Sequence, residues 1–287
     1  MNEQLILALD VGGSSVKSAL IEMGQRIVDD VRVDVIQSES SVSGILHTLA
    51  GIIDYQLGKS GGLNKTAIAF PGPFDYEQGI CLIQNQGKYD ALYGLPLGKK
   101  LKEILNLPAL EFRYRNDAEA AVLGETLYGA GVPYSRLLGV TLGTGLGTTF
   151  VAGGLPITKG DTVPPHGWLY SCLFKQQRAD DVFSTRGLLA RLREHGIHAA
   201  DIASAVQNTD IDPLLEVFAS FGSDLGLFLK PFVSNFGADA VLVTGGIAET
   251  WEYFAPSLTH SLPIPVLKGT LGKRAALLGA SALYHQG

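Results

Sequence analysis

The sequence predicts an α/β protein with two similar domains, each a mixed sheet flanked by helices. Two observations carry this prediction. First, each half of the chain opens with an apolar strand pattern, a glycine-rich turn and a second strand pattern, the turns lying at 10–17 and 141–147. Second, strand and helix patterns alternate through the rest of both halves, which is typical of α/β layers. Because each turn joins two neighbouring strands, we expect a hairpin in each otherwise parallel sheet.

The first half is predicted to follow its hairpin with helices and strands in alternation. Ile45, Leu49 and Ile53 recur at helical spacing. The segment 71–73, Pro-Gly-Pro, ends a short buried strand. The predicted strands are 5–10, 16–22, 26–36, 65–70 and 109–114, and the predicted helices are 42–58, 97–106 and 118–129.

The second half repeats this opening and then becomes less regular. A segment at 154–180 has no decipherable pattern. The predicted strands are 137–142, 147–153 and 238–244, and the predicted helices are 181–195, 200–207, 212–235 and one beginning near 273. We expect domains at 1–130 and 131–287, a hinge near 129–136, and a last helix that crosses back to the first domain.

Length and composition fit two folded domains with sizeable cores. The chain has 287 residues, of which 46% are hydrophobic and 17% charged, as in ordinary globular enzymes. Its formal net charge is −6 and it has no Lys/Arg cluster, so nucleic acid is not an expected partner. The only cysteines are Cys81 and Cys172, which argues against a disulfide framework and for a cytoplasmic protein.

No targeting or membrane segment is expected. A basic segment followed by an apolar one is not found at the N-terminus, so we predict no signal peptide. The stretch 137–158 is uncharged over roughly the width of a membrane. Its glycines, threonines and proline instead predict two buried strands around a turn.

The first glycine turn has the composition of an anion-binding loop. Gly12 and Gly13 let the backbone turn tightly, Ser14 adds a hydroxyl, and Lys17 lies in the strand that follows. Backbone N–H groups in such a turn can bind the terminal phosphates of a nucleotide. Asp10, at the strand end, is placed to hold Mg²⁺ through water. A plain hairpin with a polar tip remains the alternative.

The second turn contains Gly143, Thr144 and Gly145 and superficially resembles a dinucleotide-binding fingerprint. That motif needs a helix after the glycines, whereas residues 148–151 are strand-like. We therefore predict a second phosphate-binding turn, with an ordinary glycine hairpin as the alternative.

A third glycine segment follows the predicted strand at 238–244. Gly245 and Gly246 either let the backbone approach a flat ligand closely or simply shape the turn into a helix.

Asp117 lies where a predicted strand gives way to a helix. Aspartate at such a junction is most often a helix N-cap. The functional alternative is a general base that accepts the proton of a substrate hydroxyl during phosphoryl transfer. Both roles are open together, because Asn116 could supply the cap instead.

These segments together resemble the ROK family of bacterial sugar kinases and sugar-responsive repressors, within the actin-like ATPase (ASKHA) superfamily. The resemblance extends over most of the chain, from residue 5 to about 280. The matching segments are 9–13 with Lys17, 69–73 with Asp75, 116–121, 141–147 and 243–246.

The resemblance implies two ribonuclease-H-like domains with an interdomain cleft that takes ATP, Mg²⁺ and a sugar or sugar-like polyol. Asp117 would match the catalytic base, while Asn116 and Gly72 would lie on the substrate side. Both glycine turns would bind phosphate, and Gly245 and Gly246 would lie near adenosine. A homodimer is the family-level expectation.

The resemblance weakens in the second half. Val163 stands where a sugar-binding glutamate is expected, whereas His166 matches the histidine of the same segment. A second sugar-binding glutamate would fall at Asp180. The cysteines of the family's zinc-binding loop are absent, apart from Cys172. These departures affect sugar recognition and leave the transfer residues intact.

Other readings of the same residues stay open. Tyr89 and Trp168 could stack on a sugar, although we expect core packing for both. A sugar sensor that binds nucleotide without turnover is the alternative to a kinase. A repressor is not expected, because no helix-turn-helix precedes residue 5, and an acyl kinase would need a basic carboxylate clamp that we do not find.

Overall fold

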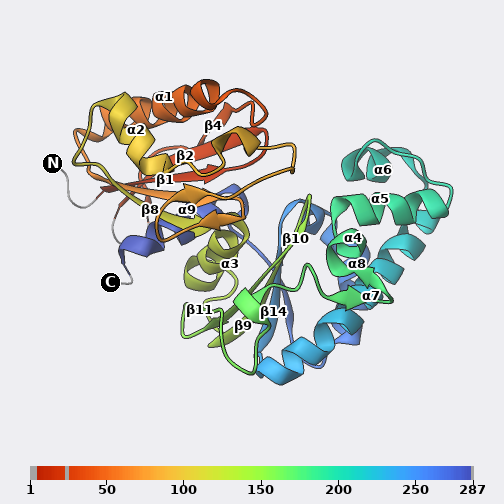
Figure 1. Cartoon of the computed structure of the whole chain (residues 1–287). Coiled ribbons are helices and arrows are strands. Elements are labelled where there is room, and N and C mark those ends of the chain that lie inside the picture. Colours follow the sequence, from red (N-terminus) through yellow and green to blue (C-terminus); the bar gives the residue numbers. More distant parts are fainter. Residues whose placement is uncertain (1–4, 23–25, 286–287) are drawn as a thin grey trace. The chain divides into compact units, whose positions relative to one another are not determined.

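The computed structural model describes residues 5–22 and 26–285 of the chain. The chain divides into two compact units, Met1–Gly124 with Lys273–Gly287 and Glu125–Gly272. The first unit thus joins the start of the chain to its end, as the colours of Figure 1 show.

The first unit contains a mixed sheet whose centre confirms the predicted opening. Its strands are β1 Leu5–Val11, β2 Ser15–Glu22, β3 Arg26–Ile27, β4 Arg32–Val35, β5 Lys65–Phe70 and β8 Glu111–Asn116. β1 and β2 form the antiparallel hairpin, and β5 and β8 extend the sheet in parallel on the other side of β1. The order is β3-β2-β1-β5-β8, with β4 also paired to β2.

The prediction of one strand at 26–36 is wrong. β3 pairs with Ile21 and Glu22 near the end of β2, whereas β4 pairs with residues 15–18 at its beginning. Asp29 lies in a bend between the two short strands. The segment therefore leaves the sheet and returns to it further along the same neighbour.

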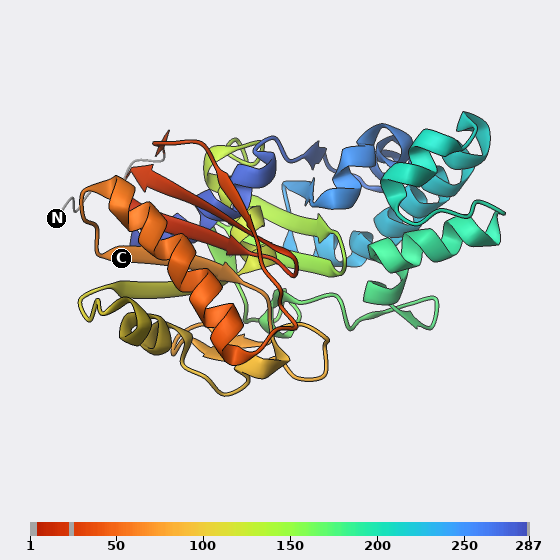
Figure 2. The same ribbon diagram turned by 90° about the horizontal axis from the view of Figure 1, so that it is seen from above.

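Helices cover both faces of this sheet, as Figures 1 and 2 show. α1 (Val42–Ser60) and α2 (Leu97–Leu105) pack on the face formed by Leu7 and Leu9. α9 (Ala275–Ser281) and the first part of α3 (Asp117–Tyr128) pack on the opposite face, where Ile6 points. The alternation of neighbouring side chains between two cores follows from the two-residue period of a strand. The predicted helices of the first half are confirmed.

The ends of α1 are set by local chemistry. Ser41 precedes the helix in an extended conformation, and its side chain accepts a hydrogen bond from the Gly44 N–H, as a typical N-cap does. Gly61 ends the helix with φ of 68°, a left-handed conformation that glycine adopts without a Cβ penalty.

The second unit repeats the strand order of the first. Its main strands are β9 Arg136–Leu142, β10 Leu146–Ala152, β11 Leu155–Ile157, β14 Ala240–Thr244 and β15 Val266–Lys268. β9 and β10 form the antiparallel hairpin, β14 pairs with β9 in parallel, and the order is β11-β10-β9-β14-β15. The predicted repetition of the opening is confirmed.

The helices of the second unit pack through aliphatic side chains and a cluster of aromatic ones. They are α4 Ala179–Phe183, α5 Thr185–Glu194, α6 Ile202–Asn208, α7 Ile211–Phe236 and α8 Trp251–Ser261. Phe221 of α7 contacts both Phe183 of α4 and Phe254 of α8 edge-on, with ring centroids 5.9 and 5.8 Å apart. This geometry is favourable for aromatic pairs.

The prediction of a single helix at 181–195 is wrong. Ser184 separates α4 from α5 with an extended backbone, φ −96° and ψ 172°. Its side chain accepts a hydrogen bond from the Gly187 N–H, so the serine caps α5 instead of continuing α4.

The segment at 154–180, which had no predicted pattern, forms short strands and one helical turn. Very short elements of this kind carry too little periodicity to be predicted. The remaining short elements of the chain are β6 Phe74–Asp75, β7 Ile80–Cys81, β12 Leu173–Phe174, β13 Gln177–Arg178 and the 3-10 turns at 90–92, 165–167, 246–250, 272–274 and 282–284.

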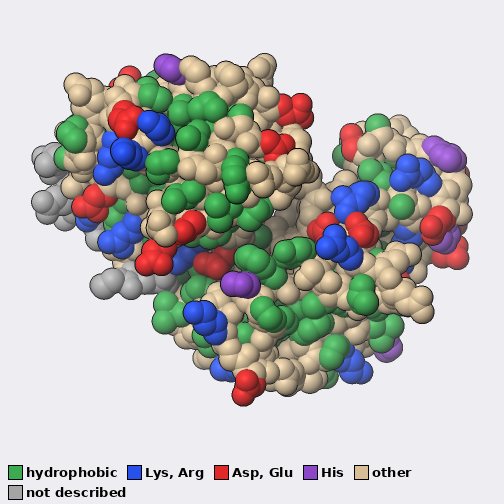
Figure 3. Space-filling model, in the orientation of Figure 1, with side chains coloured by type: hydrophobic (Ala, Val, Ile, Leu, Met, Phe, Trp, Pro, Cys, Tyr) green, Lys and Arg blue, Asp and Glu red, His purple; other side chains and the backbone are tan. Residues whose placement is uncertain are grey.

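The uncharged stretch at 137–158 contains β9, β10 and β11, which confirms the prediction of strands around a turn. Among the described residues, no helix combines the length and the apolar character that crossing a membrane requires. On the face drawn in Figure 3, the described acidic and basic side chains are interspersed.

Helices α3 and α9 approach each other through glycine. A Cβ added at Gly279 would collide with the carbonyl oxygen of Ala120, whereas a Cβ at Gly51 of α1 would meet nothing within 4 Å. Gly279→Ala should therefore cost about 1–3 kcal/mol of stability through overpacking. Gly51→Ala, the matched control, should add about 0.5–1 kcal/mol because alanine favours a helix. Urea unfolding of both variants measures the difference, and equal shifts would contradict the close helix contact.

Candidate active site

Parallel pairing brings the predicted residues of the first unit to one edge of its sheet. In the β1–β5 register Asp10 lies opposite Ala69, and in the β5–β8 register Phe70 lies opposite Asn116. The segments that follow the three strands therefore leave the sheet at the same edge. Ligands of α/β proteins commonly bind at the carboxyl ends of strands.

The first glycine turn is a tight hairpin with an exposed tip. The Gly12 N–H donates to the Ser15 carbonyl oxygen at 2.9 Å, and Gly13 and Ser14 are exposed. Lys17 faces back across the hairpin, with its Nζ 2.6 Å from Oδ2 of Asp10. The turn is thus both a hairpin and a loop with accessible backbone groups, so the two interpretations are compatible.

Tyr89 supports this turn through a hydrogen bond from its side chain. Its side chain is fully buried, and its ring lies 5.0 Å from that of Phe70. The Tyr89 hydroxyl donates to the Gly12 carbonyl oxygen at 2.5 Å. Burial raises the pKa of Tyr89, so the hydroxyl keeps its proton and remains a donor. Core packing was predicted for Tyr89 and is confirmed, whereas its hydrogen bond to the turn was not foreseen.

Asn116 supplies the cap of α3. Its Oδ1 accepts from the Glu119 N–H at 3.1 Å, which is the N-cap pattern, while its Nδ2 donates to the Tyr76 hydroxyl at 3.0 Å. Gly72 lies at the same place, because a Cβ added there would be 3.2 Å from the Tyr76 hydroxyl and 3.7 Å from Asn116 Nδ2. Tyr76 thus joins two of the predicted substrate residues, and no sequence pattern pointed to it.

Asp117 is the first residue of α3 and does not cap the helix. Its Oδ1 accepts from the Ala118 N–H at 2.9 Å. Burial raises the pKa of Asp117, the Asp10 charge raises it further, and the Ala118 N–H and the Lys88 charge lower it. A carboxylate whose pKa is raised by its surroundings is a better proton acceptor, as a general base requires.

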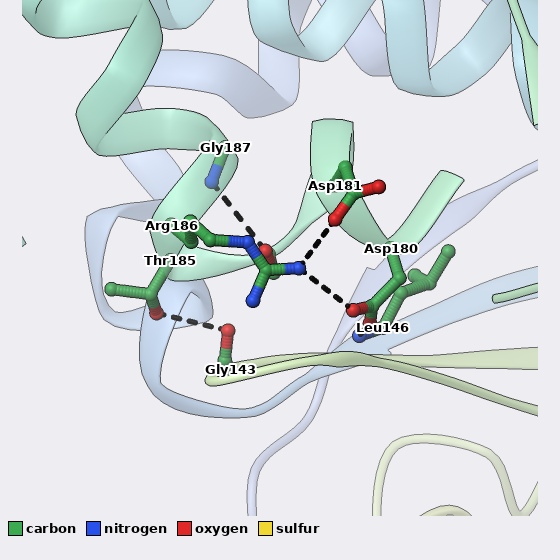
Figure 4. Close-up of polar contacts among 8 residues, drawn as sticks. Gly143, Leu146, Asp180, Asp181, Thr185, Arg186 and Gly187 are labelled. Atoms are coloured by element: carbon green, nitrogen blue, oxygen red, sulfur yellow. Dashed lines mark hydrogen bonds and ion pairs between the residues drawn. The ribbon is translucent and has the colours of Figure 1, made fainter. Parts of the chain in front are cut away.

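The second glycine turn is held by the junction of α4 and α5, as Figure 4 shows. The Gly143 carbonyl oxygen accepts from both the Thr185 N–H at 2.7 Å and the Thr185 hydroxyl at 2.9 Å. Oδ1 of Asp180 accepts from the Leu146 N–H at 2.7 Å. The tip residue Thr144 is exposed. The turn is therefore fixed at both ends and open at its tip.

Asp180 is engaged at both carboxylate oxygens. Its Oδ2 lies 3.1 Å from Nη2 of Arg186, which also lies 2.6 Å from Asp181 (Figure 4). The carboxylates, that of Asp181 above all, raise the pKa of Arg186. Sequence reasoning placed Asp180 on the substrate side, and the structure brings it to the glycine turn, 3.0 Å from a Cβ added at Gly145.

The third glycine segment lies at the same edge of the second sheet as the second glycine turn. Thr244 ends β14 opposite Thr141 of β9, so Gly245 and Gly246 follow at the level of the second turn. Gly245 has φ of 96°, and a Cβ there would collide with the Leu142 carbonyl oxygen. Glycine is therefore required at 245 by the backbone itself.

The segment after Val163 carries a row of exposed rings. His166 has φ of 60°, and its ring stacks on Trp168 at 4.6 Å, with Tyr170 a further 5.9 Å along. Thr148 fixes this row to β10, because its hydroxyl donates to the Gly167 carbonyl at 2.8 Å and accepts from the Leu169 N–H at 3.0 Å. Trp168 is 38% exposed, so the prediction that it packs in the core is wrong.

Val163 itself is buried and belongs to the apolar core of the second unit. The hairpin of β12 and β13, which follows Cys172, is held by Asp224, whose carboxylate lies 2.8 Å from both Lys175 and Arg191. Phe174 of the hairpin packs 5.2 Å from Phe183. Among the described residues, no group of three or more His, Cys, Asp or Glu side chains is arranged to hold a metal ion.

Two like sheets, each carrying a glycine turn at the carboxyl end of its parallel strands, define a duplicated α/β protein. The ROK family profile matches residues 6–287, and the chain belongs to the ROK family. A glucokinase of Halalkalibacterium halodurans is 31% identical, over 100% of this chain and 96% of that enzyme. A xylose repressor of Bacillus subtilis is 24% identical, over 96% of this chain and 76% of the repressor.

Solved structures show the same fold. A ROK family glucokinase from Streptomyces griseus, in complex with glucose and AMPPNP, superposes with a TM-score of 0.74 at 21% identity. The match covers 99% of this chain and 100% of that one. The relatives that resemble this chain in sequence include both kinases and repressors.

The hydrogen bond from the Leu146 N–H to Asp180 is expected to hold the second glycine turn in place, and this can be tested. Asp180→Ala should speed amide exchange at residues 143–147 at least fivefold and cost about 1–2 kcal/mol, because the Leu146 N–H loses a charged acceptor. Asp181→Ala removes only an exposed ion pair with Arg186 and should cost about 0–1 kcal/mol. Hydrogen–deuterium exchange of both variants, resolved to this turn, makes the comparison. Equal exchange in the two would show that Asp180 does not hold the turn.

Proposed function

We propose that this protein is an ATP-dependent kinase that phosphorylates a hydroxyl of a sugar or sugar-like polyol. The observation that carries the proposal is the juxtaposition, at one sheet edge, of a carboxylate with raised pKa and an exposed glycine turn. Asp117 would accept the proton of the substrate hydroxyl. The deprotonated oxygen would attack the terminal phosphorus, and ADP would leave with the electrons of the broken P–O bond.

Asp117 is suited to this role because its neighbours perform the structural tasks. Asn116 caps α3, so the Asp117 carboxylate accepts from the neighbouring Ala118 N–H and does not cap the helix. We propose that it meets the substrate hydroxyl. The cluster of Gly72, Tyr76 and Asn116 lies on the same segments and would contact the other sugar hydroxyls.

Asp10 is the residue that would hold Mg²⁺. Its carboxylate is mostly buried at a strand end and has one neighbouring cation, Lys17. A single carboxylate together with phosphate oxygens and water is a usual set of Mg²⁺ ligands in kinases, so this site fits the ion. When bound, Mg²⁺ would neutralise charge on the phosphate oxygens.

Exposed glycine turns are the proposed contacts of the nucleotide. Gly13 and Ser14 in one turn, and Thr144 and Gly145 in the other, would present backbone N–H groups to phosphate. The N–H groups of Gly12 and Gly143 already donate within their turns, to the Ser15 and Gly145 carbonyl oxygens, so these two glycines would shape the turns. Gly245 and Gly246 would lie against adenosine, where the absence of side chains permits close approach. The solved Streptomyces griseus glucokinase, bound to glucose and AMPPNP, supports a sugar and a nucleotide as the two ligands.

On the sugar side, we propose His166 and the exposed ring of Trp168 as contacts. Asp180, which the sequence placed on the substrate side, instead has both carboxylate oxygens engaged, by the Leu146 N–H and by Arg186. Val163 lacks the carboxylate that the family resemblance leads us to expect, so a charge-assisted hydrogen bond is missing. The flat row of His166 and Trp168 offers stacking in its place. A hexose is the proposed acceptor, consistent with the glucokinases among the relatives.

Asp117→Asn should abolish transfer while leaving nucleotide binding intact. Asparagine keeps an oxygen for the Ala118 N–H but cannot accept a proton at neutral pH, so kcat should fall at least about 1,000-fold. An assay coupled to ADP release, over a panel of hexoses, acetamido sugars and polyols, measures turnover, and calorimetry measures ATP binding. Asp54→Asn, an exposed carboxylate of α1, is the matched control.

Full activity of Asp117→Asn would contradict the assignment of the base. If the unaltered protein bound ATP and sugar but transferred nothing across the panel, a nucleotide-binding sensor without turnover would replace the kinase. The apolar Val163 is the feature that favours that second function.

Trp168→Ala should weaken the sugar without slowing the chemistry. Loss of a stacking ring is worth about 0.5–1.5 kcal/mol, so KM for the sugar should rise roughly two- to tenfold with kcat within twofold and KM for ATP unchanged. Trp168→Phe keeps a ring and should restore most of the affinity, and Tyr93→Ala, another exposed aromatic, should have no effect. An unchanged KM for every sugar turned over would remove Trp168 from the site.

A further inference from the structure

The first glycine turn is poor in available positive charge. Asp10 and Asp117 both lie at this sheet edge, and Lys17 is already paired with Asp10 at 2.6 Å. A triphosphate added at the turn would bring further negative charge next to two carboxylates. Beside the Mg²⁺ proposed at Asp10, a lysine ammonium would stabilise such a complex, because opposite charges at close range interact strongly where water is partly excluded.

Lys88 lies at the right place to supply that charge. Its Cδ atom is 4.0 Å from the position that a Cβ on Gly13 would occupy, so its aliphatic chain lies over the exposed tip of the turn. Lys88 is half-buried, and within the described part of the chain its ammonium group has neither a hydrogen bond nor an ion pair. A half-buried, unpaired ammonium is ready to bind an anion.

The loop that carries Lys88 is fixed on both sides of it. Gly87 precedes it with φ of 68°, and its N–H donates to Asp90 at 2.9 Å. Tyr89 follows it with φ of 56°, its N–H donating to Ser38 and its hydroxyl to Gly12. The residue after Lys88 thus holds the same turn over which Lys88 extends. A left-handed backbone at a residue other than glycine is costly and is often found at functional sites.

We propose that Lys88 binds the terminal phosphoryl group of ATP at the Gly12–Gly13 turn and stabilises the charge on it during transfer. This inference rests on the proposed kinase function. In the transfer step the hydroxyl proton goes to Asp117, the substrate oxygen bonds to phosphorus, and the bond from phosphorus to the ADP oxygen breaks. Lys88 keeps its proton throughout and acts as a fixed positive charge, the kind of group that contributes most to phosphoryl transfer.

Lys88 has a second effect on the same edge, through Asp117. The groups that act on the Asp117 carboxylate are Asp10, which favours its protonated form, and Lys88 and the Ala118 N–H, which favour its ionised form. Loss of the Lys88 charge should therefore raise the pKa of Asp117. Since a general base must be ionised, the acid limb of the kcat/KM profile should move to higher pH.

The test compares Lys88→Met with Lys88→Arg and with Lys99→Met, an exposed lysine of α2 that serves as control. Removing one stabilising donor from the transition state should lower kcat about 100-fold in Lys88→Met, with KM for the sugar unchanged. Lys88→Arg keeps the charge and should retain most of the activity. Lys88→Met should also shift the acid limb upward, which a merely structural residue would not do.

Nucleotide binding supplies a readout that does not require turnover. Lys88→Met should lose at least about tenfold in affinity for an ATP analogue with a non-hydrolysable β–γ bridge, and less than twofold for ADP, which lacks the terminal phosphate. Thermal melting confirms that the variants are folded. Equal losses for the two nucleotides, or kcat within twofold of the unaltered protein with an unmoved acid limb, would overturn the proposal.

The two proposals fail in different ways. If the protein binds the ATP analogue through Lys88 but never transfers phosphate, the proposed Lys88 contact stands and the proposed kinase function is contradicted. If the protein is a kinase but Lys88→Met behaves like Lys99→Met, the proposed kinase function stands and the proposed Lys88 contact is contradicted.

Discussion

Parallel pairing of β1, β5 and β8 is the constraint on which the rest of the first unit depends. Strands that run in the same direction in one sheet must end at the same edge, so residues far apart in the sequence become neighbours. The pairing of Asp10 with Ala69 and of Phe70 with Asn116 fixes that edge to within one residue. The second unit obeys the same constraint, since β9 and β14 end together at Thr141 and Thr244.

Around these edges, structural and chemical tasks fall to different side chains. Asn116 satisfies the first turn of α3, and Tyr89 holds the Gly12 carbonyl. In the second unit, Thr185 and Asp180 hold the glycine turn at its two ends. Because these neighbours satisfy the backbone, the exposed tips of both turns remain available, and Asp117 does not have to cap α3. A site organised in this way can be rigid and still have unoccupied donors and acceptors.

Much of the fold could be predicted from the sequence, because long apolar patterns dictate strands and helices. The hairpins, the helices of the first half and the repetition between halves are of this kind. The failures have local causes: Ser184 breaks a periodic helix by capping the next one, and the 26–36 segment pairs with β2 in two places. The residues proposed for catalysis stood out through glycine turns and a strand-to-helix junction. The hydrogen bonds of Tyr76 and Tyr89 could not be predicted, since they join segments that are 40 and 77 residues apart and leave no pattern in the chain.

Asp224 illustrates how a single carboxylate can tie a short hairpin to a helix. One carboxylate bridges Lys175 in the β12–β13 hairpin and Arg191 in α5. Although burial opposes ionisation, its hydrogen bonds to Lys175 and Arg191 lower the pKa of Asp224, so the bridge persists until strong acid protonates it. A hairpin secured in this manner would be loosened by acidity and by concentrated salt.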